Sequence, residues 1–285
     1  MTNQHCCIVV GVGLIGQKIV DILTLHFGQP LVPTTPIVWD KPQTIITVID
    51  YIVRTVKPRK LDIIWSAGKA GFAATDNEMQ CEFDVYSQVI RSLQVYDIAL
   101  SINLLSSAGG IYENSTFVRS LDAVSPQRPY AYWKLKQEAL LSELSIDARI
   151  YRIASVYGYK QGAGRLGLIN TMIRRTLNRE SILVFGSQNT LRDYIYHFDI
   201  ARYIVANLTQ NIFKIEILAS GKATSICALI NMVERLIRRR VKVLYVDGID
   251  NSNDIVFDRH LIPKNLQLTS LEEGVLNVFT RMKSA

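Results

Sequence analysis

The feature that most constrains the fold is a glycine-rich segment near the start of the chain. A short apolar run, Cys6–Val10, is followed directly by Gly11-Val-Gly-Leu-Ile-Gly16 and then by an amphipathic stretch to about Phe27. This order predicts a buried strand, a tight G-x-G-x-x-G turn and a helix. Glycines at this spacing let the backbone approach a pyrophosphate, and the free N–H groups of a helix N-terminus favour negative charge. The sequence therefore predicts a dinucleotide site at Gly11, Gly13, Leu14, Ile15 and Gly16.

An acidic residue that binds the adenosine ribose is expected at the end of the second strand of such a fold. Asp40 closes the run Ile37–Asp40 and lies 24 residues after Gly16, with the proline-rich segment Pro30–Pro36 between them. One interpretation makes Ile37–Asp40 the second strand, Asp40 the ribose acid and NAD the cofactor. In the other interpretation, Leu31-Val32 is a short second strand and Asp40 ends the third strand, near the adenine. We favour the first interpretation, with NADP as the alternative cofactor.

Strands and helices alternate along the middle of the chain. A helix over Thr44–Val56 precedes the buried strand Leu61–Trp65, and a helix around Asp76–Tyr96 precedes the strand Ala99–Leu105. This alternation predicts an α/β fold with a parallel, doubly wound sheet. Ligands bind at the carboxyl ends of the strands in such sheets. The residues that follow these strand ends, and that we expect beside the glycine turn, are Ala67, Gly68 and Ser107.

A strongly helical segment, 125–141, places Tyr130 and Lys134 four residues apart and therefore on one face of the helix. An ammonium group beside a phenol favours the phenolate form. Tyr130 could then take a proton from a sugar hydroxyl at neutral pH. Tyr132 and Lys136 have the same spacing but point to a different face of the helix, so they form a rival pair.

Composition limits the other classes of function. Hydrophobic residues make up 48% of the chain and charged residues 20%, which suits a soluble globular protein. The four cysteines and four histidines are scattered, so we expect no metal site, a reducing compartment and a cytoplasmic protein without a membrane segment. The net charge is +7, and an anionic small ligand explains it as well as a nucleic acid, which we do not expect. The densest basic cluster contains Arg235, Arg238, Arg239 and Arg240 and is typical of a solvated helix end.

Further motifs follow the glycine turn in a fixed order. The helix from Pro129 carries Tyr130, Lys134, Leu135 and Glu138 at characteristic positions. The other motifs are Ser106–Tyr112, Arg152–Gly158, Val184–Gly186, Arg192–Tyr196 with Asp199, and Leu271–Gly274. Together these motifs resemble the extended short-chain dehydrogenase/reductase family, in its NAD-dependent nucleotide-sugar epimerase/dehydratase branch, along nearly the whole chain.

This resemblance implies a Rossmann-type doubly wound parallel sheet with a small C-terminal α/β substrate lobe. Residues 1–158 and 185–213 would form the dinucleotide-binding domain, and residues 159–184 and 214–285 the substrate lobe. The resemblance also implies NAD as the cofactor, a nucleotide-diphosphate sugar as the substrate, a role in polysaccharide biosynthesis and a homodimer.

The resemblance assigns a role to each candidate catalytic residue. Tyr130 is the base, Lys134 holds the nicotinamide ribose and tunes the base, and Ser107 supplies a helper hydroxyl. Some positions depart from the family's pattern. Asp84 stands where an asparagine is usual, and the helper position could fall on Ala108 in place of Ser107. The expected substrate-binding residues are Ser107, Ser155 (also in place of a usual asparagine), Arg165 and Arg192, which would clamp the diphosphate.

Among the reactions of this family, a 4-epimerisation through a transient 4-keto sugar fits best. A 4,6-dehydratase needs a pair of carboxyl groups after the helper hydroxyl, where Ala108 and Gly109 stand. Isomerases of the 3,5 type carry a cysteine beside the helper serine, and the sequence has none there. The alternatives are a nucleotide-sugar ketoreductase or dehydrogenase, and a non-catalytic dinucleotide-binding sensor.

Overall fold

The computed structural model describes residues 5–27, 37–162, 167–208, 212–246 and 253–284 of the 285-residue chain. The chain forms two compact units. The first contains Met1–Ile111, Pro126–Arg152 and Ala201–Glu216, and the second contains Tyr112–Ser125, Ile153–Ile200 and Ile217–Ala285. This division differs from the one expected from the sequence, because residues 112–125, 153–158 and 185–200 belong to the second unit and residues 214–216 to the first.

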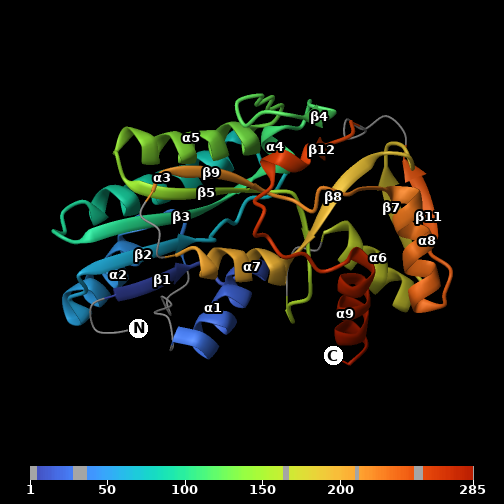
Figure 1. Ribbon diagram of the computed structural model, residues 1–285, viewed down its shortest axis with the longest axis horizontal. Helices are drawn as coiled ribbons and strands as arrows, with labels where there is room; N and C mark the ends of the chain where they lie inside the picture. The colour runs from blue at the N-terminus through green and yellow to red at the C-terminus, as the bar shows by residue number, and fades with distance from the viewer. Residues whose placement is uncertain (1–4, 28–36, 163–166, 209–211, 247–252, 285) are drawn as a thin grey trace. The chain divides into compact units, whose positions relative to one another are not determined.

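The first unit is built on a five-stranded sheet in the order β1-β2-β3-β5-β9 (Figure 1). β1 pairs in parallel with β2, and β2 pairs in parallel with β3, so that Val10 lies opposite Trp65 and Trp65 opposite Leu104. Because parallel strands end at the same edge, the loops that follow β1, β2 and β3 leave the sheet together. The predicted α/β fold with a parallel central sheet is confirmed. The strands are β1 (His5–Val10), β2 (Lys60–Trp65), β3 (Ala99–Ser107), β5 (Asp147–Ile153) and β9 (Lys214–Leu218).

Local sequence signals explain where the helices of this unit begin. Proline stands at the start of α2 and of α5, where its missing N–H costs nothing. Thr75 and Glu78 form a capping box at the start of α3. Residues of α2, α3 and α5 share one apolar core with a face of the sheet. The helices are α1 (Leu14–Phe27), α2 (Pro42–Val56), α3 (Asp76–Leu93), α4 (Ala108–Ile111) and α5 (Pro129–Glu143), and α7 (His197–Ala206) continues from the second unit into the first.

The prediction that Ile37–Asp40 is a strand is wrong. These residues lead into a turn directly before α2, in which Lys41 N donates to the carbonyl oxygen three residues earlier (2.9 Å). Ile37 and Trp39 pack against the core of the first unit, so the apolar run reflects the burial of two side chains. The alternative short strand, Leu31-Val32, lies outside the described residues.

The second unit combines small sheets with helices. β8 lies between β10 and β6, β7 pairs in parallel with β11, and β4 pairs in parallel with β12. The helices α6, α8 and α9 contribute to one apolar core with β7 and β8. The strands are β4 (Phe117–Val118), β6 (Ser155–Tyr157), β7 (Ser181–Phe185), β8 (Leu191–Tyr196), β10 (Ala223–Ser225), β11 (Lys242–Val246) and β12 (Val256–Phe257), and the helices are α6 (Leu168–Leu177), α8 (Ile226–Ile237), η1 (Arg259–Leu261) and α9 (Leu271–Lys283). Within the described ranges, no helix has both the length and the apolar composition needed to cross a bilayer.

Candidate active site

The turn after β1 has the geometry that its glycine spacing predicts. Gly11 has φ of +92°, and a Cβ atom there would lie 2.5 Å from the backbone of Ala67, so only glycine fits between these two strand ends. A Cβ on Gly16 would lie 2.1 Å from the carbonyl oxygen of Gly11, so this glycine lets α1 pack against the turn. A Cβ on Gly13 would meet no atom within 4 Å. The middle glycine therefore faces open space at the N-terminus of α1, whose first residues are Leu14 and Ile15, and a pyrophosphate fits such a place.

Asp40 lies in the turn before α2 and is exposed. The helix that follows has 15 residues, about 22 Å of axial length. It ends at Val56, four residues before β2 begins, so its first turn lies toward the carboxyl end of that strand. Asp40 can therefore reach the same edge of the sheet as the glycine turn without being part of a strand.

The loop after β2 is held by a buried carboxylate. Glu82 of α3 is only 3% exposed, and its Oε1 accepts hydrogen bonds from the backbone N–H groups of Lys69 and Ala70. A Cβ on Gly68 would lie 3.6 Å from the other oxygen of this carboxylate. Glu82 was not predicted from the sequence, although an acid among the apolar positions of a helix is a usable signal. Asp84, which was singled out, is exposed.

The last two residues of β3 and the first residue of α4 have different environments. Ser106 is buried and donates from Oγ to Glu138 Oε1 (2.6 Å). Ser107 ends β3 and is half-buried, and its Oγ accepts a hydrogen bond from Gly110 N (3.2 Å). That bond leaves the hydroxyl proton of Ser107 able to donate to another group. Ala108 is fully buried, so the hydroxyl at this edge of the sheet belongs to Ser107.

Tyr130 occupies the second position of α5 and is half-buried. Its ring packs over Gly110, where a Cβ atom would lie 3.1 Å from Tyr130 Cδ1. On another side, the centroid of the Phe72 ring lies 6.2 Å from that of Tyr130, and Arg128 Cζ lies 4.7 Å from the Phe72 centroid. Because Gly110 also donates to Ser107, this glycine brings the helper hydroxyl and the tyrosine ring to one corner of the first unit.

Lys134 lies one helical turn after Tyr130 and is only 6% exposed. Its Nζ atom lies 5.9 Å from the centroid of the Tyr130 ring and 3.1 Å from Gln137 Oε1. A buried ammonium needs hydrogen-bond acceptors, and the amide of Gln137 supplies one of them. Gln137 was not predicted from the sequence, although it lies three residues after Lys134 and therefore on a neighbouring part of the same helix face.

The rival pair has a different environment. Tyr132 is 53% exposed. Lys136 Nζ lies 3.6 Å from the centroid of the Trp133 ring, and Trp133 Nε1 donates to Asp76 Oδ1 (2.8 Å). Lys136 thus packs against an aromatic ring on the helix surface, whereas Lys134 is buried against the Tyr130 ring.

A buried ion pair fixes α5 to the strands beneath it. Glu138 and Arg152 are 5% and 5% exposed, and Arg152 Nη2 lies 2.7 Å from Glu138 Oε2. Arg152 Nε also donates to this carboxylate (3.1 Å), and Ser106 donates to it from β3. Removing one member of a buried pair leaves an uncompensated charge, so this contact holds the helix in one position. The pair thereby fixes the register of Tyr130 and Lys134 against the ends of β3 and β5.

The second unit holds the other predicted residues. Ser155 begins β6 and pairs with Tyr194 of β8, two residues after Arg192. Arg192 is half-buried, and its Nη1 donates to the carbonyl oxygens of Leu191 (2.9 Å) and Asn253. Burial lowers the pKa of the Arg192 guanidinium from its usual value. Arg165 lies outside the described residues.

Two acids of the second unit have structural partners. Asp193 accepts hydrogen bonds from Ser220 N (2.6 Å) and Gly221 N (2.7 Å), which tie β8 to the loop before β10. Burial raises the pKa of the Asp193 carboxyl. Asp199 accepts from both Thr269 N (2.7 Å) and Thr269 Oγ1 (2.8 Å). These two carboxylates stabilise loops of the second unit.

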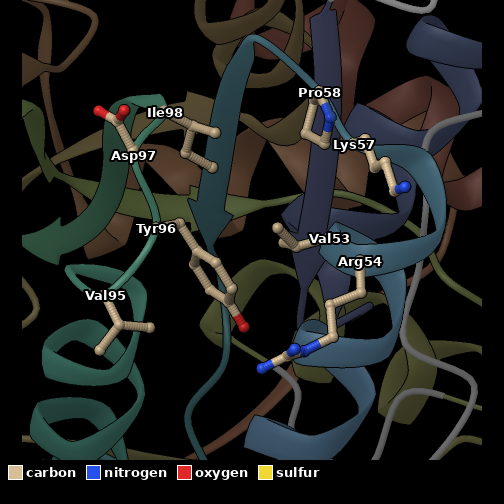
Figure 2. A pocket seen from close by; sticks show the side chains of 8 residues that line it. All are labelled: Val53, Arg54, Lys57, Pro58, Val95, Tyr96, Asp97 and Ile98. Carbon is tan, nitrogen blue, oxygen red and sulfur yellow. The ribbon is translucent and has the colours of Figure 1, made fainter.

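A cavity of about 710 Å³ lies at the opposite edge of the first unit's sheet, where β2 and β3 begin. Figure 2 shows Val53 and the ring of Tyr96 on facing sides of it, with the Arg54 guanidinium directed toward the tyrosine hydroxyl. Asp50 accepts hydrogen bonds from Arg54 Nε (2.8 Å) and from the Tyr96 hydroxyl. The charge of Arg54 is therefore paired, and we assign this cavity no part in the chemistry.

Comparison with known families decides the membership of the chain. A model of the NAD-dependent epimerase/dehydratase family matches residues 43–217, more than half of the chain. The chain belongs to this family. The match begins at the first turn of α2, after the segment in which the expected second strand was not found.

Relatives with known names include an epimerase and a reductase. The chain is 31% identical over 159 residues to the UDP-glucuronate 4-epimerase of Thermodesulfobacterium geofontis, covering 53% of this chain and 48% of the relative. It is 28% identical over 193 residues to the dTDP-4-dehydro-6-deoxyglucose reductase of Escherichia coli, covering 64% and 60%. The chain thus matches about half to three fifths of the length of these curated relatives.

Solved structures match the fold of nearly the whole chain. The UDP-glucuronic acid 4-epimerase of Bacillus cereus, solved in complex with UDP-glucuronic acid and NAD, matches with a TM-score of 0.79 and 19% sequence identity. This match covers 98% of the present chain and 99% of the solved one. At this identity the likeness establishes the fold, and the chemistry has to be inferred from the residues of this chain.

Proposed function

We propose that this chain binds NAD and interconverts nucleotide-diphosphate sugars by epimerisation at C4, through a transient 4-keto sugar. The observation that carries the proposal is the corner formed by Ser107, Tyr130 and Lys134, in which a buried ammonium lies 5.9 Å from a phenol ring beside a serine hydroxyl. A phenol that can act as a base, with a hydroxyl and an ammonium group beside it, suits proton transfer to or from a substrate hydroxyl. The membership in the NAD-dependent epimerase/dehydratase family and the open glycine turn support the same conclusion.

Each residue of the corner has a distinct task in this reaction. Tyr130, as phenolate, takes the proton from the sugar hydroxyl. The Ser107 hydroxyl donates a hydrogen bond to the same sugar oxygen. Bound NAD supplies the acceptor for the hydride that leaves the carbon. Lys134 uses one of its N–H groups for Gln137, which leaves others for the hydroxyls of a ribose. The keto sugar then rotates to present its other face, and as its carbon takes the hydride back, Tyr130 returns the proton to its oxygen.

The glycine turn and Asp40 would bind the adenosine half of the cofactor. The open space before Gly13 admits the pyrophosphate to the first turn of α1, with Leu14 and Ile15. A carboxylate at Asp40 accepts hydrogen bonds from ribose hydroxyls and repels a 2′-phosphate, so it favours NAD over NADP. Ala67 and Gly68 would line the same cofactor edge after β2.

An epimerase is favoured over the alternatives by what surrounds Ser107. Ala108 and Gly109 stand where a 4,6-dehydratase would need its carboxyl pair. A ketoreductase or dehydrogenase would use the same corner, and the reductase among the relatives keeps it as the second candidate. A non-catalytic sensor would not need the buried Lys134. The homodimer and the role in polysaccharide biosynthesis stay predictions.

Substrate recognition is assigned to the second unit. Arg192 would hold the diphosphate of the nucleotide sugar, since a planar guanidinium matches two phosphate oxygens. Ser155, on the neighbouring strand β6, would contribute a hydroxyl to the sugar, and Arg165 a second cation. In this assignment the second unit is the substrate lobe and the first unit binds the dinucleotide.

The substitution Arg192→Ala tests this assignment. It should weaken the binding of a uridine-diphosphate sugar by about one to two decades, because a charge-assisted hydrogen bond contributes about 1.5–3 kcal/mol. Affinity for NAD should not change. Both constants are measured by isothermal titration calorimetry on the full chain.

Arg239→Ala is the matched control for this experiment. Arg239 also donates from Nη1 to a backbone carbonyl, that of Leu177 (3.0 Å), but it belongs to the exposed basic cluster and to no predicted site. This variant should bind the nucleotide sugar normally. If Arg192→Ala binds as tightly as Arg239→Ala, Arg192 does not contact the substrate.

A further inference from the structure

Gln137 is a buried polar side chain for which the reaction described above has no role. It lies in the middle of α5 and is 1% exposed. Its Oε1 accepts from Lys134 Nζ (3.1 Å), and its backbone carbonyl accepts from the Tyr86 hydroxyl (3.2 Å). Burying an amide costs free energy unless it is hydrogen-bonded, so an apolar residue would be the simpler choice for packing alone.

Whether the side chain at position 137 is neutral or charged determines its effect on Lys134. A neutral amide oxygen fixes the position of the ammonium and leaves its positive charge uncompensated. A carboxylate at the same atom would form an ion pair with Lys134 and cancel most of its field at the Tyr130 ring. An apolar side chain would leave the buried ammonium without this acceptor.

The other charged groups around this corner are engaged elsewhere. On α5, the Glu138 carboxylate binds Arg152 of β5 and Ser106 of β3. On α3, Asp76 accepts from Trp133, Glu82 accepts from the amides of Lys69 and Ala70, and the Tyr86 hydroxyl donates to Gln137. The Arg128 guanidinium, at the start of α5, lies over the Phe72 ring. Lys134, by contrast, is a charged group placed directly against the Tyr130 ring.

We propose that Gln137 is a positioning residue for the reaction: its neutral amide holds the Lys134 ammonium against Tyr130 without cancelling the charge that favours the phenolate. This proposal rests on the proposed function, in which Tyr130 is the base. It assigns a role to a residue of this chain that touches neither sugar nor cofactor and acts through Lys134.

The test compares three variants of the full chain. Gln137→Glu keeps the size and adds a carboxylate, Gln137→Met keeps the length and removes the acceptor, and Gln88→Glu adds the same charge at an exposed position of α3 as the control. Turnover of a uridine-diphosphate hexose is followed across pH for each variant, with kcat and KM separated. Thermal unfolding confirms that each variant is folded.

In Gln137→Glu, the new carboxylate cancels the positive charge of Lys134 beside Tyr130. The pH below which kcat falls should then rise by at least about one unit, because the loss of a neighbouring opposite charge shifts a titration by about 1–3 units. Activity at neutral pH should therefore drop about tenfold and recover at higher pH, with little change in KM. In Gln137→Met, kcat should fall at least about tenfold at every pH without this shift, because a displacement of ~1 Å in a catalytic group can cost up to ~10²-fold. Gln88→Glu should match wild type.

A merely structural role of Gln137 would give equal losses of kcat in Gln137→Glu and Gln137→Met with an unmoved pH profile, and that result would overturn the proposal.

A second readout does not depend on turnover. The ultraviolet absorbance of phenolate is titrated in each protein and in the same protein carrying Tyr130→Phe, and the difference reports the ionisation of Tyr130. Gln137→Glu should move this ionisation to higher pH, and an unmoved ionisation contradicts the role of Gln137. Absence of turnover in wild type with every nucleotide sugar would instead contradict the proposed function, so the two failures are distinguishable.

Discussion

Tyr130→Phe is expected to lower kcat by at least ~10²-fold while leaving the fold and the binding of NAD and nucleotide sugar unchanged. The substitution removes only the phenolic oxygen, and general base catalysis is typically worth ~10²–10⁴-fold. The ring itself stays in place, because its packing over Gly110 and beside Phe72 uses carbon atoms. The measurement is the rate of interconversion of uridine-diphosphate hexoses, with dissociation constants determined alongside.

Tyr132→Phe is the control for this prediction. Tyr132 is 53% exposed and is separated from Tyr130 by about 200° around the helix, so the two rings cannot face the same ligand. This variant should keep wild-type turnover. A large loss in Tyr132→Phe with full activity in Tyr130→Phe would reverse the assignment of the base and remove Lys134 from the mechanism.

Gly13→Asp is expected to weaken NAD binding by at least about two decades, or about 2.7 kcal/mol. The new carboxylate would occupy the open space in front of the turn and would repel the pyrophosphate. Gly13 is the N-cap residue of α1, since its carbonyl oxygen accepts a hydrogen bond from Gln17 N (3.1 Å). An aspartate side chain at this position would therefore also compete with the pyrophosphate for the free N–H groups of α1. Aspartate is a favoured residue at such a position. The melting temperature should therefore stay the same or rise while the cofactor is lost.

Gly16→Ala provides the contrasting variant. Its Cβ would lie 2.1 Å from the carbonyl oxygen of Gly11, so the turn has to shift at a cost of about 1–3 kcal/mol. This variant should lose stability, measured by urea unfolding, as well as cofactor. Calorimetry that gives Gly13→Asp an unchanged affinity for NAD would place the cofactor elsewhere.

The sequence predicts the fold well where a residue pattern is compatible with only one type of secondary structure. The apolar run Cys6–Val10 lies within β1, and the strand predicted at Leu61–Trp65 lies within β2, because both are buried on two faces of a parallel sheet. Ile37–Asp40 was predicted wrongly because four residues are too few to show a period. Their apolar side chains pack against the core from a turn, and only the tertiary structure reveals this packing.

For the candidate site, the sequence predicts the residues whose spacing along one element carries the signal. Tyr130 and Lys134 share a helix face, and the glycines share a turn. Glu82 and Gln137 were missed because their roles depend on contacts with a loop and with a buried ammonium, which a linear pattern does not specify. Between Ser107 and Ala108, the burial of Ala108 at the start of α4 supports the proposal that Ser107 supplies the helper hydroxyl.

The most direct test of the account is a product assay with the purified wild-type protein, NAD and a panel of uridine-diphosphate and thymidine-diphosphate sugars. Separation of the nucleotide sugars by anion-exchange chromatography identifies each product, and reduced cofactor is monitored in the same reaction. The account predicts that at least one sugar is converted to its C4 epimer without net accumulation of reduced cofactor. Net reduction or oxidation of the cofactor in step with sugar turnover would contradict epimerisation and favour the reductase, and binding of NAD without conversion of any sugar would favour a sensor.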